Sequence, residues 1–233
     1  MDWENRTKRL IGLDSVEKLH NKSVCVLGLG GVGSAAVEAL ARAGVGKLII
    51  LDSDNVDITN INRQIIATHK TVGKSKCEVE SERILDINPN CVVTEIKEFL
   101  GSANSEIVFN KNPDYIIDAI DTVSAKLSVI EKAFAKNIKI ISCMGTGNRT
   151  HPEKFLIGDI KDTAGCGCNL AKVMRHELKK RNIENLKVVY STETPINSIE
   201  EENGRHIPAS ISTCPTAAGI LLASFVINDI LEK

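Results

Sequence analysis

Apolar runs alternate with helical stretches along the first part of the chain. The runs lack strict alternation of apolar and polar residues, as expected for strands that helices cover on both faces. The first helical stretch ends at Gly44, and the second stops before Pro89. This order predicts a doubly wound, Rossmann-like α/β fold with a mostly parallel sheet. The predicted strands are 24–27, 47–51, 92–96, 115–117 and 138–142, and the predicted helices are 32–43, 76–87 and 124–135.

The pattern weakens beyond residue 150. We expect the terminal helix, which is largely apolar, to lie in the core or in a dimer interface. A chain of 233 residues fits one domain. We interpret 1–150 as its nucleotide-binding core and 151–233 as an elaboration of that same domain. The elements expected in the second half are strands at 155–157 and 188–190 and helices at 170–181 and 216–232.

Composition bears on partners and location. The net charge is -1 and aromatic residues make up 3%, so we expect neither a general attraction to nucleic acid nor a base-stacking platform. The start is polar, and the longest apolar run, 220–227, is too short to cross a membrane. Seven cysteines without an export signal favour reduced thiols. We therefore expect a cytoplasmic protein that makes no membrane contact.

A glycine-rich loop follows the first predicted strand and opens the first predicted helix. Its glycines are Gly28, Gly30, Gly31 and Gly33. Such a loop lets the backbone approach a phosphate, and the helix N-terminus adds free N–H groups and partial positive charge. Asp52 ends the second strand about 20 residues further on, where an acid can bind ribose hydroxyls. The pattern predicts an adenine nucleotide and leaves both a dehydrogenase and an ATP-using enzyme open.

Charged residues further along favour a triphosphate. A triphosphate carries more charge than a dinucleotide pyrophosphate and needs cations, usually with Mg²⁺. Arg63 and Lys76 can supply cations, and Asp121 follows the fourth strand at the edge of the sheet where ligands bind. A carboxylate there can hold Mg²⁺ together with phosphate oxygens. Each residue also has an ordinary interpretation: a loop arginine, a surface lysine and, for Asp121, a helix N-cap.

Taken in order, five segments resemble the ubiquitin-activating-like family, which includes bacterial enzymes that adenylate sulfur carriers. The segments are 28–33, 52–54, 60–64, 73–76 and 118–121. The resemblance covers residues 5–150 and implies a homodimer, in which Arg9 reaches the phosphates bound by the neighbouring subunit. The residues that it assigns to ATP or Mg²⁺ are Gly28, Gly30, Gly31, Gly33, Asp52, Asp54, Asn60, Arg63, Lys76 and Asp121.

The second half narrows this resemblance. Sulfur-carrier enzymes typically hold zinc with two Cys-x-x-Cys pairs, whereas this chain has only a Cys-x-Cys at 166–168, so we expect no structural zinc. Segments 142–149, 159–163 and 189–195 are similar to tRNA threonylcarbamoyladenosine dehydratases and extend the resemblance over nearly the whole chain. Those enzymes use ATP to cyclise a threonylcarbamoyl group on an adenosine beside the anticodon.

Activation of a carboxylate by ATP, followed by ring closure within the same substituent, is the chemistry that this resemblance implies. The predicted catalytic residues are Arg9, Arg63, Lys76 and Asp121. Ring closure of this kind needs no enzyme thiol. Cys214, ahead of the terminal helix, is the thiol to examine, and the roles of Cys166 and Cys168 stay open.

One predicted helix offers a basic face for tRNA. Basic side chains there can meet phosphates, although a solvated helix surface explains them at least as well. Two other functions also stay open, an adenylyltransferase for a ubiquitin-like sulfur carrier and a non-catalytic sulfur-relay partner, as does docking of a sulfur-transfer protein. The basic face holds Lys172, Arg175, His176 and Lys179, and the apolar face holds Leu170, Val173, Met174 and Leu178.

Overall fold

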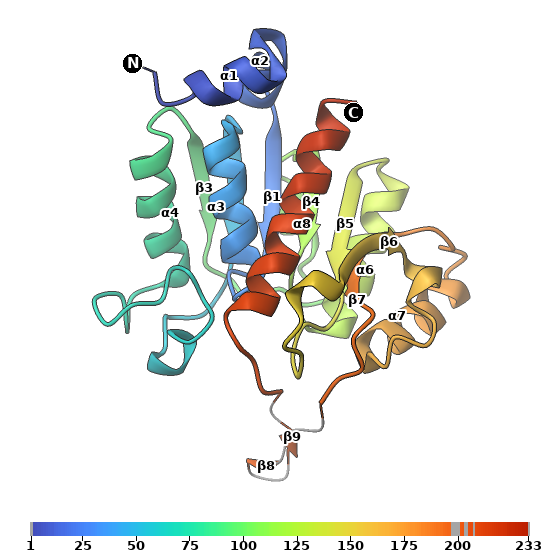
Figure 1. Ribbon diagram of the computed structural model, residues 1–233. Coiled ribbons are helices and arrows are strands. Elements are labelled where there is room, and N and C mark those ends of the chain that lie inside the picture. The colour runs from blue at the N-terminus through green and yellow to red at the C-terminus, as the bar shows by residue number, and fades with distance from the viewer. Residues whose placement is uncertain (1, 197–200, 203–204, 207, 233) are drawn as a thin grey trace.

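A seven-stranded sheet forms the centre of the computed structural model, which describes residues 2–196, 201–202, 205–206 and 208–232 (Figure 1). The strand order is β3-β2-β1-β4-β5-β7-β6, and only the β6–β7 pair at one edge is antiparallel. The doubly wound α/β fold is therefore confirmed. The strands are β1 (Ser23–Leu27), β2 (Lys47–Leu51), β3 (Val92–Ile96), β4 (Tyr115–Asp118), β5 (Lys139–Cys143), β6 (Phe155–Asp159) and β7 (Lys187–Ser191).

Helices cover both faces of this sheet. Val24 and Val26 of β1 pack in one core cluster with α3, α4 and α8, whereas Cys25 and Leu27 pack in a second cluster with α5, α6 and α7. Every residue of β1 is buried, as expected for a central strand. The helices are α1 (Asn5–Ile11), α2 (Leu13–His20), α3 (Gly33–Ala43), α4 (Lys76–Ile87), α5 (Glu106–Phe109), α6 (Val123–Ala135), α7 (Asn169–Lys180) and α8 (Thr213–Ile230).

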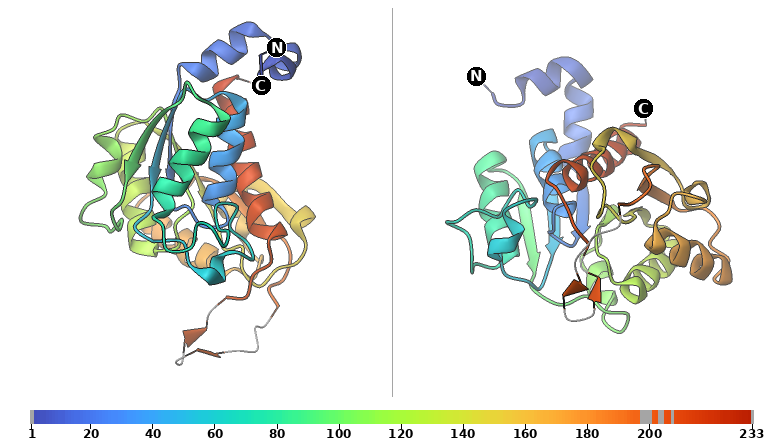
Figure 2. Two further views of the ribbon diagram at one scale, coloured as in Figure 1. Left: turned by 90° about the vertical axis from the view of Figure 1, so that its left-hand side faces the viewer. Right: turned by 60° about the horizontal axis from the view of Figure 1, so that its bottom comes forward.

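Two segments lie at opposite ends of the strands. Helices α1 and α2 cap the edge where the parallel strands begin (Figure 1). Figure 2 shows a small hairpin, β8 (Glu201–Glu202) with β9 (Arg205–His206), projecting beyond the edge where the strands end. Three short 3₁₀ helices, η1 (Ile58–Asn60), η2 (Pro152–Lys154) and η3 (Ile160–Thr163), lie in loops of the described chain.

The predicted elements are confirmed with small shifts at their ends. Helix α4 has the predicted bounds, whereas α6 begins one residue earlier, at Val123. The predicted start of the terminal helix was wrong, because α8 begins at Thr213 and includes Pro215. Proline fits the first turn of a helix, where its missing N–H breaks no hydrogen bond. Strands β6 and β7 come from the second half and extend the same sheet, while the division at residue 150 stays a prediction.

The terminal helix α8 is a helix of the core. Its 18 residues have a mean hydropathy of 1.4, so by length and composition alone this helix could cross a membrane. The apolar run 220–227 therefore underestimated the length of the apolar helix. It lies directly against α3, because a Cβ at Gly219 would come within 2.2 Å of the carbonyl oxygen of Val32. Cys214, Leu222 and Val226 are fully buried in the same cluster. Its apolar composition thus serves packing on α3.

Candidate active site

The glycine loop joins β1 to α3 through a close backbone contact. Gly28 has a left-handed backbone, with φ 84°, and a Cβ at Gly33 would lie 1.7 Å from the carbonyl oxygen of Gly28. Only glycine fits at Gly33. By contrast, a Cβ at Gly30 would have no heavy atom within 4 Å. Gly30 therefore borders open space, where a phosphate can approach the backbone.

The predicted nucleotide-binding residues gather around a pocket of about 310 Å³ at the carboxyl ends of β1, β2 and β4. Ligands bind at this place in sheets of such topology. Two predicted residues do not line it. Gly33 packs behind the loop, and the side-chain oxygen of Asn60 accepts a hydrogen bond from the Asp57 N–H at 3.1 Å. The predicted residues that line it are Gly28, Gly30, Gly31, Asp52, Asp54, Arg63, Lys76 and Asp121.

Asp52 organises the pocket as well as lining it. Its carboxylate accepts hydrogen bonds from the N–H groups of Leu29 at 2.7 Å and Asp54 at 2.8 Å. The Lys76 ammonium nitrogen lies 2.8 Å from Asp54 Oδ2 and 3.7 Å from Asp52 Oδ1. Because the Lys76 side chain is only 7% exposed, its interpretation as a surface lysine is wrong. Two carboxylates hold this cation beside the glycine loop.

Arg63 and Asp121 complete the lining. Arg63 donates through Nη1 to the Thr59 carbonyl oxygen at 3.1 Å and to Asn62 Oδ1 at 2.9 Å, which fixes its side chain on its own loop. The N-cap residue of α6 is Thr122, so the interpretation of Asp121 as a helix cap is wrong. Asp121 is exposed and forms no ion pair with any residue that the structure describes. Its carboxylate is accessible to a ligand in the pocket.

Sequence reasoning missed an ion pair beneath the pocket. Lys126 and Asp118 are both fully buried, with Nζ and Oδ2 3.0 Å apart. The lysine also donates to the carbonyl oxygens of Ile120 at 2.9 Å and Cys143 at 3.0 Å. The pair therefore ties the ends of β4 and β5 to the loop that carries Asp121. No signal in the sequence marks this lysine, because it stands in an ordinary helical pattern.

The structure describes all four predicted catalytic residues. Among them, Arg9 alone lies apart from the pocket. It is exposed on α1, at the edge where the strands begin, whereas the pocket lies where they end (Figure 1). The sheet separates the two within one chain. Arg9 therefore does not contribute to the pocket of its own chain.

The cysteines are unsuited to nucleophilic chemistry. All seven are buried. Burial raises the pKa of Cys77 and Cys143 to about 12 and that of Cys91 to about 11. Burial also raises the pKa of Cys214, although a hydrogen bond with Thr213 opposes the shift. The structure thus gives no support to Cys214 as a nucleophile, since a reactive thiolate needs accessible, electropositive surroundings.

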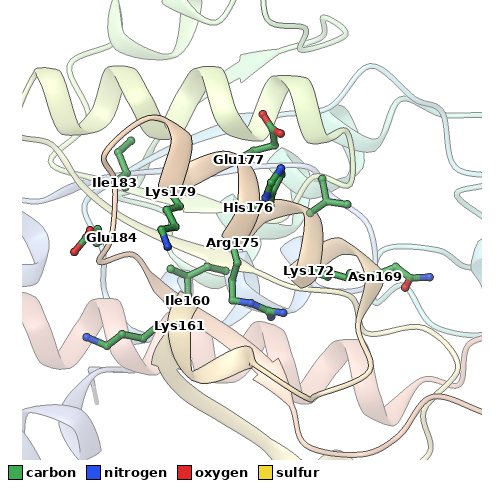
Figure 3. A pocket seen from close by; sticks show the side chains of 11 residues that line it. Ile160, Lys161, Asn169, Lys172, Arg175, His176, Glu177, Lys179, Ile183 and Glu184 are labelled. Carbon is green, nitrogen blue, oxygen red and sulfur yellow. The ribbon is translucent and has the colours of Figure 1, made fainter.

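The basic helix face lines a second, larger groove of about 1070 Å³ beside α7. Figure 3 shows Arg175 and Lys179 projecting from α7 on the side of η3. Arg175 is partly engaged there, because it donates to the Thr163 carbonyl oxygen at 2.8 Å. The assignment of Val173 to the apolar face was wrong, since it is 43% exposed and lines the groove. The basic residues in the lining are Lys161, Lys172, Arg175, His176 and Lys179.

The glycine loop, the buried Lys76 and the accessible Asp121 define a nucleotide-binding α/β protein. This chain belongs to the ThiF family, whose sequence pattern matches residues 4–233. The resemblance drawn from the sequence is therefore confirmed. Within the described residues, no cluster of three or more His, Cys, Asp or Glu side chains is placed to hold a metal ion.

Several relatives of the chain carry one name. It is 39% identical over 241 residues to the tRNA threonylcarbamoyladenosine dehydratase of Bacillus subtilis, covering 98% of this chain and 94% of that protein. It is 32% identical over 248 residues to tRNA threonylcarbamoyladenosine dehydratase 2 of Saccharomyces cerevisiae, covering 96% of this chain and 55% of that protein.

The solved structure of the Escherichia coli tRNA N6-threonylcarbamoyladenosine dehydratase in complex with AMP has the same fold. It aligns with a TM-score of 0.89 and 30% identity, over 98% of this chain and 93% of that one. The same enzyme in complex with ATP aligns with a TM-score of 0.88. The similarity thus spans both the nucleotide-binding half and the second half of the chain.

Two glycine substitutions separate folding from nucleotide binding. Gly33→Ala should lower the free energy of unfolding by about 1–3 kcal/mol or more, because its Cβ would overlap the Gly28 carbonyl. Gly30→Ala should leave that free energy within about 0.5 kcal/mol. It should instead weaken ATP binding by roughly tenfold, since a methyl group would stand where the backbone approaches a phosphate. Denaturant titration and calorimetry measure the two effects. If Gly30→Ala and the unaltered protein bound ATP with equal affinity, the glycine loop would not be part of the nucleotide site.

Proposed function

We propose that this chain is an ATP-dependent tRNA threonylcarbamoyladenosine dehydratase. The observation that carries the proposal is the joint placement of Lys76, Arg63 and Asp121 around the glycine-loop pocket, in a chain similar over nearly its whole length to enzymes of that name. The reaction cyclises the threonylcarbamoyl group of the modified adenosine with loss of one water. The enzyme acts in the cytoplasm.

The chemistry begins with a poor electrophile, the free carboxylate of the threonyl group. One carboxylate oxygen attacks a phosphorus atom of ATP, so that an O–P bond forms while that phosphorus releases pyrophosphate in adenylyl transfer or ADP in phosphoryl transfer. The carbonyl carbon then carries a leaving group. A nitrogen of the same substituent then attacks that carbon, so that an N–C bond forms, the nitrogen loses its proton, the activated C–O bond breaks, and AMP or phosphate leaves. Because both groups belong to one substituent, the effective concentration of the nucleophile is high.

The residues of the pocket stabilise charge during the first step. Lys76 and Arg63 are cations placed beside the glycine loop, where the phosphates would lie. Asp121 suits a Mg²⁺ ion, because its carboxylate is exposed in the pocket and phosphate oxygens can complete the coordination shell. Bound Mg²⁺ would neutralise the phosphate charge. Asp52 would meet the ribose hydroxyls while its backbone contacts hold the loop.

Two features support a homodimer with shared sites. Arg9 lies at the edge of the sheet opposite its own pocket, so it can contribute only to the pocket of a second subunit. Around it, α1 and α2 expose large apolar side chains: Leu10 is 83% and Leu13 64% exposed. Apolar side chains at such exposure suit a surface that a partner covers.

The groove beside α7 is the proposed contact for tRNA. Lys172 and Lys179 are exposed on its lining, and Arg175 and Lys161 add to the positive charge. Basic side chains of this kind bind phosphates without reading sequence. Docking of a sulfur-transfer protein remains a prediction without a further supporting feature.

An adenylyltransferase for a sulfur carrier is the alternative function. The chain is 32% identical to the ThiS adenylyltransferase of Escherichia coli, but over only 59% of its own length. It also lacks the Cys-x-x-Cys pairs that such enzymes carry. The dehydratase is therefore the better supported function.

Product analysis tests the proposal. Incubation of the protein with ATP, Mg²⁺ and tRNA carrying threonylcarbamoyladenosine should convert that nucleoside to a product lighter by one water. Asp121→Ala should lower the rate by roughly 10²–10³-fold, because it removes the Mg²⁺ ligand without touching the core. Mass spectrometry of the digested nucleosides measures both. An unchanged nucleoside, in a preparation that adenylates a ubiquitin-like C-terminus, would instead establish the alternative function.

Mixed dimers test the sharing of sites. Arg9→Ala and Asp121→Ala subunits should each be nearly inactive alone, because either change disables both sites of a homodimer. After subunit exchange, half the dimers would be mixed, each with one intact site, so activity should recover to roughly a quarter of the unaltered level. Native mass spectrometry confirms the exchange. Exchange without recovery would show that Arg9 does not act across the interface.

Charge reversal tests the groove. Lys172→Glu and Lys179→Glu should weaken binding of modified and unmodified tRNA alike, because the contacts are to phosphates. Each lost contact should also reduce the salt dependence of binding by about one unit of slope. Filter binding at several salt concentrations measures both quantities. Glu184, in the same lining, offers a control, since Glu184→Gln should not weaken binding. If both lysine variants kept the affinity for tRNA and the slope of its salt dependence, tRNA would bind elsewhere on the protein.

A further inference from the structure

A buried glutamate stands at the start of α1, far from the nucleotide pocket of its own chain. Glu4 is only 6% exposed, whereas none of the seven residues of α1 is buried. Its carboxylate has two partners: Oε1 lies 2.6 Å from His20 Nε2, and Oε2 lies 3.2 Å from Lys8 Nζ. A carboxylate can only accept, so the His20 ring donates from Nε2. Glu4 thus joins the start of α1 to the end of α2.

Two glycines in the turn between α3 and β2 make room for this contact. A Cβ at Gly44 would lie 2.6 Å from Glu4 Oε1, and a Cβ at Gly46 would lie 1.7 Å from the His20 carbonyl oxygen. Gly44 also ends α3 with φ 89°, so its backbone favours glycine in any case. Gly46 has no positive φ, so the close approach of His20 is what excludes a side chain there. The turn is therefore a seat for the start of α1 and the end of α2.

Arg9 lies on the short helix that this seat holds (Figure 1). Its side chain is exposed and forms no ion pair with any residue that the structure describes. At the other end of α1, Ile11 packs partly against the core. The joint to α2 is Gly12, with φ 88° and no heavy atom within 4 Å of a Cβ built there. The direction of α1, and with it the position of Arg9, therefore depends on the contact of Ile11 at one end and of Glu4 at the other.

We propose that Glu4, held by His20, positions Arg9 for the nucleotide pocket of the second subunit. This inference rests on the proposed function, in which that pocket receives Arg9 across the interface. Without the Glu4 contact, α1 is free to turn about its Ile11 end while the rest of the fold stays as it is. A displacement of about 1 Å at a reacting phosphate can lower a rate by about 100-fold. Glu4 and His20 are positioning residues, because they act through Arg9.

Mixed dimers separate this role from a general effect on folding. In a dimer of one Arg9→Ala and one Asp121→Ala subunit, the working pocket takes its Arg9 from the Asp121→Ala chain. Glu4→Gln added to that chain should lower the recovered rate of conversion of modified tRNA by roughly tenfold. Glu4→Gln added to the Arg9→Ala chain should leave the recovered rate nearly unchanged, because the α1 helix of that chain serves only the inactive pocket.

Further variants serve as the control and as the second line of the test. Glu17→Gln on α2 makes the same change of charge at an exposed position, and it should have no effect in either chain. His20→Ala covers the case in which Glu4→Gln fails to fold, because the His20 side chain is 43% exposed. It should give the same asymmetry as Glu4→Gln. His20→Gln keeps a nitrogen that can donate to Glu4, so it should restore most of the rate.

Three results would overturn the inference. The first is an equal loss of rate with Glu4→Gln in either chain, which would show a structural role only. The second is full recovery when Glu4→Gln or His20→Ala stands in the chain that donates Arg9. Both of these leave the sharing of sites intact, because the Arg9→Ala and Asp121→Ala dimer still recovers. The third is no recovery in that dimer itself, which would remove Arg9 from the second pocket. Conversion of modified tRNA by the unaltered protein tests the dehydratase function separately.

Discussion

The ion pair between Lys126 and Asp118 is the contact on which the floor of the nucleotide pocket depends. Its two charges are fully buried, so their removal from water is offset only by their attraction and by hydrogen bonds. The lysine nitrogen meets that requirement with three oxygen partners. Loss of one partner from such a pair typically costs about 3–5 kcal/mol, because the other charge stays buried. The pair is therefore costly to break.

The hydrogen bonds of the lysine reach two neighbouring segments. The Ile120 carbonyl belongs to the loop that carries Asp121, so the lysine holds the backbone of that loop one residue before the proposed Mg²⁺ ligand. The Cys143 carbonyl lies at the end of β5. On the other side, Pro215 at the start of α8 would meet a Cβ at Gly31 at 3.0 Å. The glycine loop and the loop that carries Asp121 are thus each held by a close contact with the rest of the fold, which suits a reaction that needs its groups in fixed positions.

The sequence predicted the fold and the lining of the nucleotide pocket because both depend on local patterns. The glycine spacing and the acid after β2 stand beside strand ends, whereas the resemblance to a known family assigned Arg63 and Lys76 to the site. The buried role of Lys126 could not be predicted, because a lysine in a helical pattern is ordinarily expected at the surface and its burial depends on how α6 packs against the ends of β4 and β5. Arg9 shows the converse: the resemblance suggested its role, and its distance from its own pocket supplies a physical reason for a second subunit.

The central claim is that ATP activates the carboxylate of the modified base, and the fate of that carboxylate's oxygen tests it most directly. tRNA whose threonyl carboxylate carries heavy oxygen would be converted by the protein with unlabelled ATP in unlabelled water. The account predicts that one labelled oxygen leaves with a phosphorus-containing product. The label would appear in AMP if the adenylyl group is transferred and in phosphate if the phosphoryl group is transferred. If the nucleoside were cyclised and the heavy oxygen that it lost were found only in water, ATP would not have activated the carboxylate.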